Sequence, residues 1–240
     1  MDIGFYEQFS NIQDKHWWFS SKRRIVSDLL SIKGFRNQEI LDVGCGAGLM
    51  LQELVKFGHV RGMDGSEEAI RFSSKVFQGE IKLGSLPDLI PFPSEQFTLV
   101  TALDVIEHVD DDVAALIAIK NVMKKDGSLL ITVPAYQFLW SKHDDLNEHK
   151  RRYTKNELEQ KLKLAGFNLE KISYYNTLLF PLIASIRMIN KFLRLNEGSD
   201  VEMPGKFINF VLKNIFLLEK YWLRHFVFPF GVSLIAIAKK

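Results

Sequence analysis

The chain has 240 residues, of which 47% are hydrophobic and 25% are charged. These values exclude a disordered or low-complexity chain and fit one domain of ordinary size, or one domain with an appendage. The formal net charge is only +2, but residues 176–240 hold nine Lys and Arg against four Asp and Glu. A lone cysteine, Cys45, excludes an internal disulfide and a cysteine-rich zinc site.

Two uncharged tracts near the C-terminus, 172–186 and 226–238, are shorter than the roughly 18 apolar residues that indicate a membrane span. Both also contain proline. The first residues are acidic and lack the basic-then-apolar run of a secretory signal. We therefore expect a cytoplasmic location, and a peripheral contact with a membrane stays open.

Strand and helix signals alternate from residue 38 onward. The predicted strands are 38–43, 59–63, 80–83, 97–103, 128–134, 168–175 and 231–240. The predicted helices are 48–57, one that starts at Ser66, one from Asp110–Asp112 to Asp126, one from Thr154 to Ala165, 178–195 and 206–224. This alternation predicts a mostly parallel sheet that helices cover on both faces.

Ligands of open parallel sheets bind outside the carboxyl ends of the strands. Four segments follow predicted strand ends, namely 44–48, Asp64, 84–86 and 103–108. We expect these segments to meet at one rim of the sheet.

Gly44, Gly46 and Gly48 stand at alternate positions directly after the first predicted strand. Glycine lets the main chain turn tightly and lets a ligand approach it closely, so these residues predict a hollow in front of a helix N-terminus. A dinucleotide fingerprint needs its third glycine one residue later, where this chain has Leu49. Asp64 at the end of the second strand suits a carboxylate that accepts hydrogen bonds from ribose hydroxyls.

Three stretches in order, ILDVGCGAG at 40–48, VRGMDGS at 60–66 and FTLVTALDVIEHV at 97–109, resemble the class I S-adenosylmethionine-dependent methyltransferases. The likeness is greatest to the small-molecule group called methyltransferase type 11, and it covers residues 38–175. It implies a Rossmann-like α/β fold with a mostly parallel sheet and an antiparallel last strand. It also implies S-adenosyl-L-methionine as the cofactor.

Carried over residue by residue, the resemblance implies cofactor contacts at Asp42, Gly44, Gly46, Gly48, Asp64, Gly65, Ser85, Leu86, Leu103 and Asp104. Asp42 would anchor the methionine ammonium through water, and Asp64 would hold the ribose hydroxyls. Many relatives have an acidic residue after the third strand for the adenine amino group; this chain has Gly84 and Ser85 there. We expect Ser85 or the Leu86 backbone to take that contact. The alternative, a plain glycine turn with Asp42 as a loop cap, stays open.

The segment LWSKHDDLNEHKRRYT, 139–154, follows the fifth strand, where relatives place acceptor-binding residues. A hydroxyl acceptor must lose its proton, and a neutral histidine is the usual base. The catalytic candidates are His149, His143 and His108, and the acceptor-binding candidates here are Arg152 and Tyr153. A solvated loop is the alternative for the segment, and a packing role is the alternative for His108.

A metal site would need ligands at a recognisable spacing. His143, Asp144 and His149 match no established spacing. We therefore expect no metal, and a site formed by these three residues is the alternative.

Trp17 and Trp18 precede the α/β pattern, and adjacent residues cannot share one helical face. We expect at least one of them to cover the cofactor or the acceptor, with simple helix packing as the alternative. The predicted division is a helical lid segment (1–37), a cofactor-binding α/β domain (38–175), a helical insertion (176–230) and the final strand of the domain (231–240).

The insertion is apolar and basic. It suits a roof over an apolar acceptor, docking on an anionic membrane surface or a homodimer interface; helices buried against the domain are the alternative. No interleaving of aromatic and basic residues suggests a nucleic-acid partner.

The sequence thus predicts S-adenosylmethionine-dependent methyl transfer to a small-molecule acceptor such as a sugar, a lipid-linked intermediate or another metabolite, with O-methylation favoured. One alternative is a catalytically silent cofactor-binding module that acts through its helical insertion. Another is a nicotinamide-dependent oxidoreductase, against which Leu49 argues.

Overall fold

The computed structural model describes residues 12–193 and 203–240. In these residues, seven strands form one sheet in the order β3-β2-β1-β4-β5-β7-β6. The strands are β1 (Gln38–Val43), β2 (Gly58–Asp64), β3 (Ile81–Leu83), β4 (Phe97–Leu103), β5 (Met123–Pro134), β6 (Asn168–Tyr175) and β7 (Ser233–Lys239).

The sheet is parallel except at its last strand. β1 pairs in parallel with β2 and β4, and β4 pairs in parallel with β5. β7 lies between β5 and β6 and is antiparallel to both. The predicted fold class, a Rossmann-like sheet with an antiparallel last strand, is confirmed.

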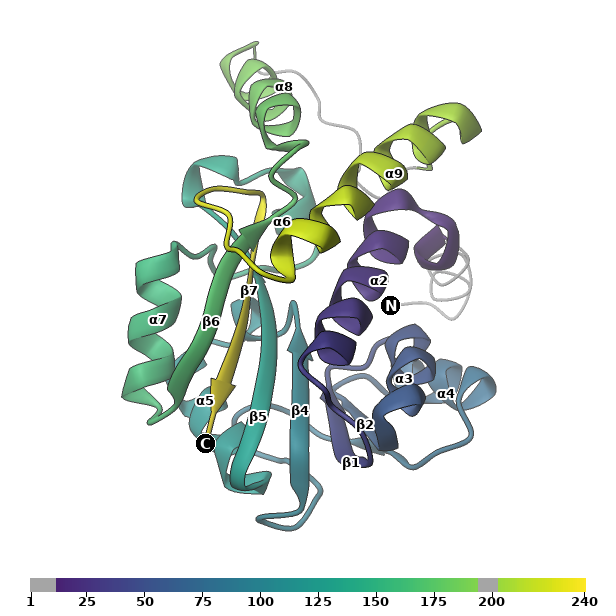
Figure 1. The fold of residues 1–240 in the computed structure, drawn as a ribbon, viewed down its shortest axis with the longest axis vertical. Coiled ribbons are helices and arrows are strands. Elements are labelled where there is room, and N and C mark those ends of the chain that lie inside the picture. Colours follow the sequence, from purple (N-terminus) through teal and green to yellow (C-terminus); the bar gives the residue numbers. More distant parts are fainter. Residues whose placement is uncertain (1–11, 194–202) are drawn as a thin grey trace.

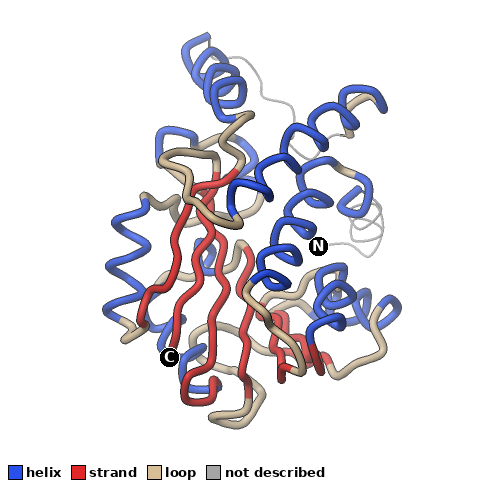
Figure 2. Tube along the Cα trace, viewed as in Figure 1, coloured by secondary structure: helices blue, strands red, loops and turns tan. Residues whose placement is uncertain are grey.

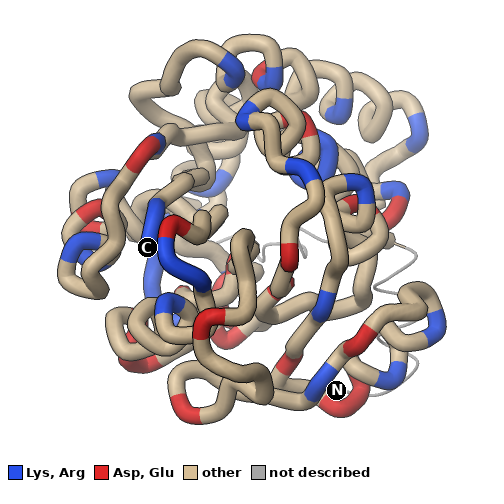
Figure 3. The backbone as a smooth tube through the Cα atoms, turned by 60° about the horizontal axis from the view of Figure 1, so that its bottom comes forward, with Lys and Arg blue, Asp and Glu red and all other residues tan. Residues whose placement is uncertain are grey.

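Helices form the outer layers of the molecule, with the sheet between them (Figure 2). They are α2 (Trp17–Ile32), α3 (Leu49–Leu54), α4 (Glu67–Val76), α5 (Asp112–Val122), α6 (Lys142–Leu146), α7 (Lys155–Leu164), α8 (Phe180–Leu193) and α9 (Lys206–Leu223). Acidic and basic residues are interspersed around the body of the fold (Figure 3).

Strand side chains alternate between two apolar clusters, one on each face of the sheet. Leu41 belongs to the cluster that includes residues of α5 and α7. Its neighbour Ile40 belongs to the cluster that includes residues of α2, α3 and α9. Because successive strand residues point to opposite faces, a sheet buried on both sides needs strands that are apolar throughout. β4 is apolar apart from Thr98 and Thr101, and β1 buries Ile40, Leu41 and Val43, which fits their central place.

Helix starts follow the predicted caps. The Ser66 hydroxyl accepts a hydrogen bond from the Ala69 amide at 3.3 Å, and Thr154 and Glu157 form a capping box at the start of α7. The predicted end of the helix near Asp126 is wrong. α5 ends at Val122 because the next residue, Met123, already pairs with β4.

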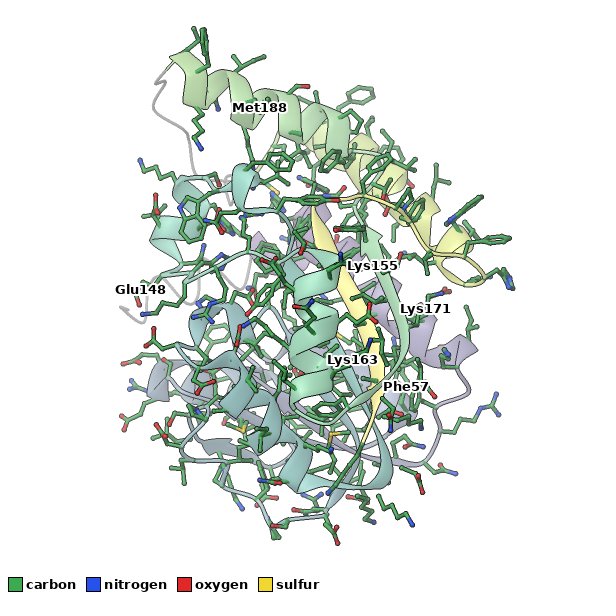
Figure 4. The ribbon with its side chains drawn as sticks, turned by 90° about the vertical axis from the view of Figure 1, so that its left-hand side faces the viewer. Phe57, Glu148, Lys155, Lys163, Lys171 and Met188 are labelled. Carbon is green, nitrogen blue, oxygen red and sulfur yellow. The ribbon has the colours of Figure 1, made fainter. Side chains whose placement is uncertain are left out.

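α8 and α9 connect β6 to β7, close to the two helices predicted for this region; Leu195 lies outside the described residues. α9 runs beside α2 (Figure 1), and the Trp17 amide donates to Asn209 Oδ1 at 2.8 Å. α8, which carries Met188, extends away from the sheet (Figure 4). Among residues 12–193 and 203–240, no helix combines the length and the hydropathy needed to cross a bilayer.

Candidate active site

A cavity of about 440 Å³ lies at the carboxyl ends of the central strands. The loop after β1 forms one wall, and residues of α2 form another. The end of β4, the segment from His143 to Arg152 and residues of α8 complete it. Segments far apart in the sequence therefore enclose one space.

The loop after β1 presents bare backbone to this cavity. Gly44 and Gly46 have φ angles of 69° and 52°, in the left-handed region that favours glycine. A Cβ atom added at Gly46 would meet no atom within 4 Å. The Gly46 amide donates to Asp64 Oδ2 at 2.8 Å, so the tips of β1 and β2 are joined. This is the hollow that the glycine spacing predicted.

Two carboxylates at these tips are held by short hydrogen bonds. Asp42 is buried and accepts from the Thr101 hydroxyl at 2.6 Å. Burial raises the pKa of Asp42 to about 7, although Thr101 and the Lys22 ammonium oppose the rise. Burial also raises the pKa of Asp64, whose second oxygen accepts from the Ser66 amide at 3.0 Å.

The predicted cofactor residues divide into two sets. Asp42, Gly44, Gly46, Leu103 and Asp104 line the cavity. Of the other described residues in the prediction, Gly48, Asp64, Gly65, Ser85 and Leu86 do not line it. Their contacts with the cofactor stay a prediction.

Asp104 directly follows the last residue of β4 and lines the cavity. It adopts a φ of 58°, and its Oδ1 accepts from the Thr132 hydroxyl at 2.8 Å. Burial acts to raise its pKa, but the charge and hydrogen bond of Lys22, together with the Thr132 hydroxyl, hold the pKa below its usual value. Lys22 comes from α2, so this ion pair fixes α2 over the end of β4.

Trp17 and Trp18 both line the cavity. The Trp18 ring stacks on Phe216 of α9 at 5.3 Å between centroids, and on Tyr175 at 6.2 Å. Trp17 meets the Phe216 ring edge-on at 6.0 Å. Packing against α9 thus holds both indoles beside the cavity, and their contact with an acceptor stays a prediction.

Three histidines gather on the part of the cavity wall formed by His108 after β4 and by the segment 143–152, which we call the histidine end. The rings of His108 and His149 are 4.7 Å apart, and those of His143 and His149 are 6.1 Å apart. His149 Nδ1 lies 2.8 Å from Asp144 Oδ1. A carboxylate at Nδ1 favours the tautomer that carries its proton there, which leaves Nε2 as a base or a ligand.

Asp144 is fully buried, and Arg152 pairs with both of its oxygens at 2.8 and 2.9 Å. Burial acts to raise its pKa, but the hydrogen bond to His149 and the charge of Arg152 hold the pKa well below its usual range. Arg152, predicted to contact the acceptor, is thus also the residue that fixes Asp144.

Tyr153 lies in the core, outside the cavity-lining residues among those described. Its hydroxyl donates to Asp112 Oδ2 at 2.9 Å. The side chain therefore faces away from its neighbour Arg152, and an acceptor contact by Tyr153 is not supported by its position.

Glu107 lines the cavity beside His108, and the sequence reasoning did not single it out. Its carboxylate is buried and accepts no hydrogen bond from any described residue. Burial and the nearby charge of Asp104 raise its pKa well above the usual value. The sequence feature that could have indicated Glu107 is its place directly before His108, shortly after the end of a strand.

Comparison with known proteins identifies the central domain. The family described as "Methyltransferase domain" matches residues 41–131. The chain carries a class I methyltransferase domain. That match spans β1 to β5 and includes Asp42, the glycine loop, Asp64, Glu107 and His108.

Several relatives share this methyltransferase domain. A "Ubiquinone biosynthesis O-methyltransferase" of Neisseria meningitidis is 27% identical over 148 residues, which cover 55% of this chain and 62% of the relative. An uncharacterized methyltransferase of Schizosaccharomyces pombe is 33% identical over 133 residues, covering 49% of this chain and 47% of the relative. The chain thus spans less than two thirds of the length of these curated relatives.

Solved structures share the fold over a greater length. A putative methyltransferase from Haloferax volcanii, solved in complex with the Trm112 methyltransferase activator, has a TM-score of 0.64 at 17% identity and covers 98% of this chain and 94% of its own. A putative methyltransferase from Bacillus halodurans has a TM-score of 0.61 at 20% identity, covering 88% and 96%. These likenesses show the fold.

Proposed function

We propose that this chain transfers a methyl group from S-adenosyl-L-methionine to an oxygen atom of a small-molecule acceptor. One observation carries the proposal: a single cavity is lined by the bare backbone of Gly44–Ala47 and by the histidines His108, His143 and His149. Methyl transfer needs the two reactants in line, close together and shielded from water. A space enclosed by both groups of residues supplies that arrangement.

The glycine end of the cavity suits the cofactor. The open space in front of Gly46 accommodates a group that packs on backbone, and Asp42 offers a carboxylate for an ammonium group. The cofactor would supply a methyl group bound to a positively charged sulfur. Asp104, which Lys22 and Thr132 fix, would border the reacting centre.

The histidine end suits a hydroxyl acceptor. An acceptor oxygen must lose its proton, and Asp144 orients His149 for this task. His143 and His108 remain the other predicted candidates. The relatives named as ubiquinone biosynthesis O-methyltransferases support oxygen as the acceptor atom.

The helical insertion exposes many apolar side chains, and its helix α8 also lines the cavity through Ile183 and Arg187. The exposed side chains include Leu182, Ile186, Met188, Ile189 and Phe192 on α8, and Phe207, Ile208, Phe210, Leu218, Tyr221 and Trp222 on α9. Such a surface supports a contact with an apolar acceptor, an anionic membrane or a second copy of the chain. These three roles, and the division into lid, domain and insertion, stay predictions.

A transfer assay tests the proposal. The purified chain is incubated with S-adenosylmethionine and a panel of phenols, catechols and sugars, and release of S-adenosylhomocysteine is followed. We expect His149→Gln to lower kcat by about 10²–10⁴-fold while leaving the cofactor Kd unchanged. Cofactor binding without transfer to any acceptor would favour a silent binding module, and preferential binding of a nicotinamide dinucleotide would favour an oxidoreductase.

A further inference from the structure

We propose that Glu107, His108 and His149 bind one divalent transition-metal cation, of the Zn²⁺ type, at the histidine end of the cavity. One ligand atom from each side chain can be chosen so that the three atoms lie within 4.8 Å of one another. Glu107 and His149 also line the cavity, so a bound cation would face an acceptor.

The strongest support is the environment of Glu107. Its side chain is fully buried, and neither carboxylate oxygen has a hydrogen-bond partner in the part of the chain that the structure describes. A buried carboxylate without a hydrogen-bond partner destabilises the fold, and a bound cation would remove this cost by coordinating the carboxylate. A cation between Glu107 and the two imidazoles would give one of these oxygens a partner.

The backbone holds the two halves of this site together. Glu107 and His108 lie in one tight 3-10 turn, Ile106–His108, after β4. The Lys150 amide donates to the Glu107 carbonyl at 2.7 Å, which ties the segment carrying His149 to this turn. The ligands therefore come from a fixed turn and from a segment bonded to it.

A second layer of residues orients one ligand. The other ring N–H of a metal-bound histidine usually donates a hydrogen bond to a carboxylate, a backbone carbonyl or a water, which fixes the tautomer. Asp144 occupies that position at His149 Nδ1, and Arg152 fixes Asp144 in turn. Nε2 of His149 is the nitrogen that remains for the cation.

The ligand types select the cation. Two imidazoles and one carboxylate form a set typical of Zn²⁺ with an open position, whereas Mg²⁺ prefers oxygen ligands. With metal–ligand bonds of about 2.1 Å, tetrahedral ligand atoms lie about 3.4 Å apart. The ligand atoms, now within 4.8 Å of one another, would approach by up to about 1.4 Å on binding, and the exposed ring of His108 can turn to allow this.

The role of the cation rests on the proposed function. An acceptor hydroxyl on the open position would be more acidic, because the cation stabilises the alkoxide. Because Nε2 of His149 would hold the cation, the cation would replace His149 as the group that activates the acceptor, and the O–H bond would break with loss of its proton to cavity water. A bond from that oxygen to the methyl carbon would then form as the carbon–sulfur bond breaks, with the electron pair staying on sulfur.

Cobalt binding tests the site without cofactor or acceptor, so its outcome is independent of methyl transfer. The metal-free chain is titrated with Co²⁺ and followed by visible absorption, then Zn²⁺ is added in competition. We expect one Co²⁺ per chain, displaced by Zn²⁺. Glu107→Gln and His149→Gln should weaken binding at least about tenfold, whereas His59→Gln, an exposed histidine on β2, should not change it.

The variants also separate binding from folding. Glu107 has no hydrogen bond to lose among the described residues, so Glu107→Gln should keep the wild-type thermal midpoint or raise it. If circular dichroism shows that it does not fold, His108→Gln at an exposed position supplies the same comparison. Absence of saturable Co²⁺ binding, or equal affinity in the folded Glu107 or His108 variant and the wild type, would overturn the proposal.

Discussion

The raised pKa of Asp42 makes cofactor affinity depend on pH. Asp42 has a pKa of about 7 because it is buried, so below pH 7 it is mostly neutral in the free chain. An ammonium group binds the ionised form, and at lower pH binding must first remove a proton. The apparent Kd for S-adenosylmethionine should therefore rise as the pH falls through 7.

The size of the effect follows from a single ionisation. With a pKa of about 7, the ionised fraction of Asp42 falls about 25-fold between pH 7.5 and pH 5.5, which corresponds to roughly 2 kcal/mol of binding free energy. Asp64, whose pKa burial also raises, would add to the same trend.

Calorimetry across this pH range measures the dependence. Asp42→Asn keeps the shape of the side chain and removes its ionisation, so we expect weaker binding at pH 7.5 and a much smaller change toward pH 5.5. A wild-type Kd that is flat between pH 5.5 and 7.5, or an equally steep dependence in Asp42→Asn, would refute this reasoning.

Three further predictions concern stability, the insertion and the indoles. Burial raises the pKa of Glu219 to about 7, above its value in the unfolded chain. Its contribution to stability is therefore present below about pH 4.5 and is lost as the pH rises through 7. Glu219→Gln should be more stable than the wild type by up to about 3 kcal/mol at pH 8 and nearly equal to it at about pH 4.5; urea unfolding that shows the same difference at both pH values would contradict this. If α8 and α9 dock on membranes, the chain should sediment with phosphatidylglycerol vesicles in a salt-sensitive way, and changing the exposed Phe192 and Phe207 together to Ser should reduce this sedimentation. The control Leu164→Ser, at an exposed position on α7, should not reduce it. Equal sedimentation of the wild type and both variants would reject docking. Trp17→Ala should weaken cofactor or acceptor binding several-fold with the fold retained, and unchanged kinetics would reject the lid.

Sequence pattern predicted the sheet well, because its strands are apolar runs between clear turn residues. β4 at 97–103 and β6 at 168–175 have the predicted bounds. The end of α5 could not be read from the sequence, because pairing with Phe97 draws Met123 into β5. Local signals near Asp126 and Gly127 pointed to a later end, but a sheet contact formed by distant residues decided it.

The site was harder to predict because it depends on which way adjacent side chains point. The sequence predicted that Arg152 and Tyr153 both contact the acceptor. Tyr153 forms a bridge with Ala135 in extended chain, where neighbours face opposite sides, so one lies at the cavity and the other in the core. Glu107 gained significance only when the Lys150 hydrogen bond brought His149 beside it.

The central claim is that the joined tips of β1 and β2 bind S-adenosylmethionine, and calorimetry at pH 7.5 with this cofactor and its demethylated product tests it most directly. We predict one binding site per chain for both compounds, and a loss of most affinity in Asp64→Ala with the fold intact by circular dichroism. No binding of either compound to the folded wild-type chain, or undiminished affinity in Asp64→Ala, would contradict the account.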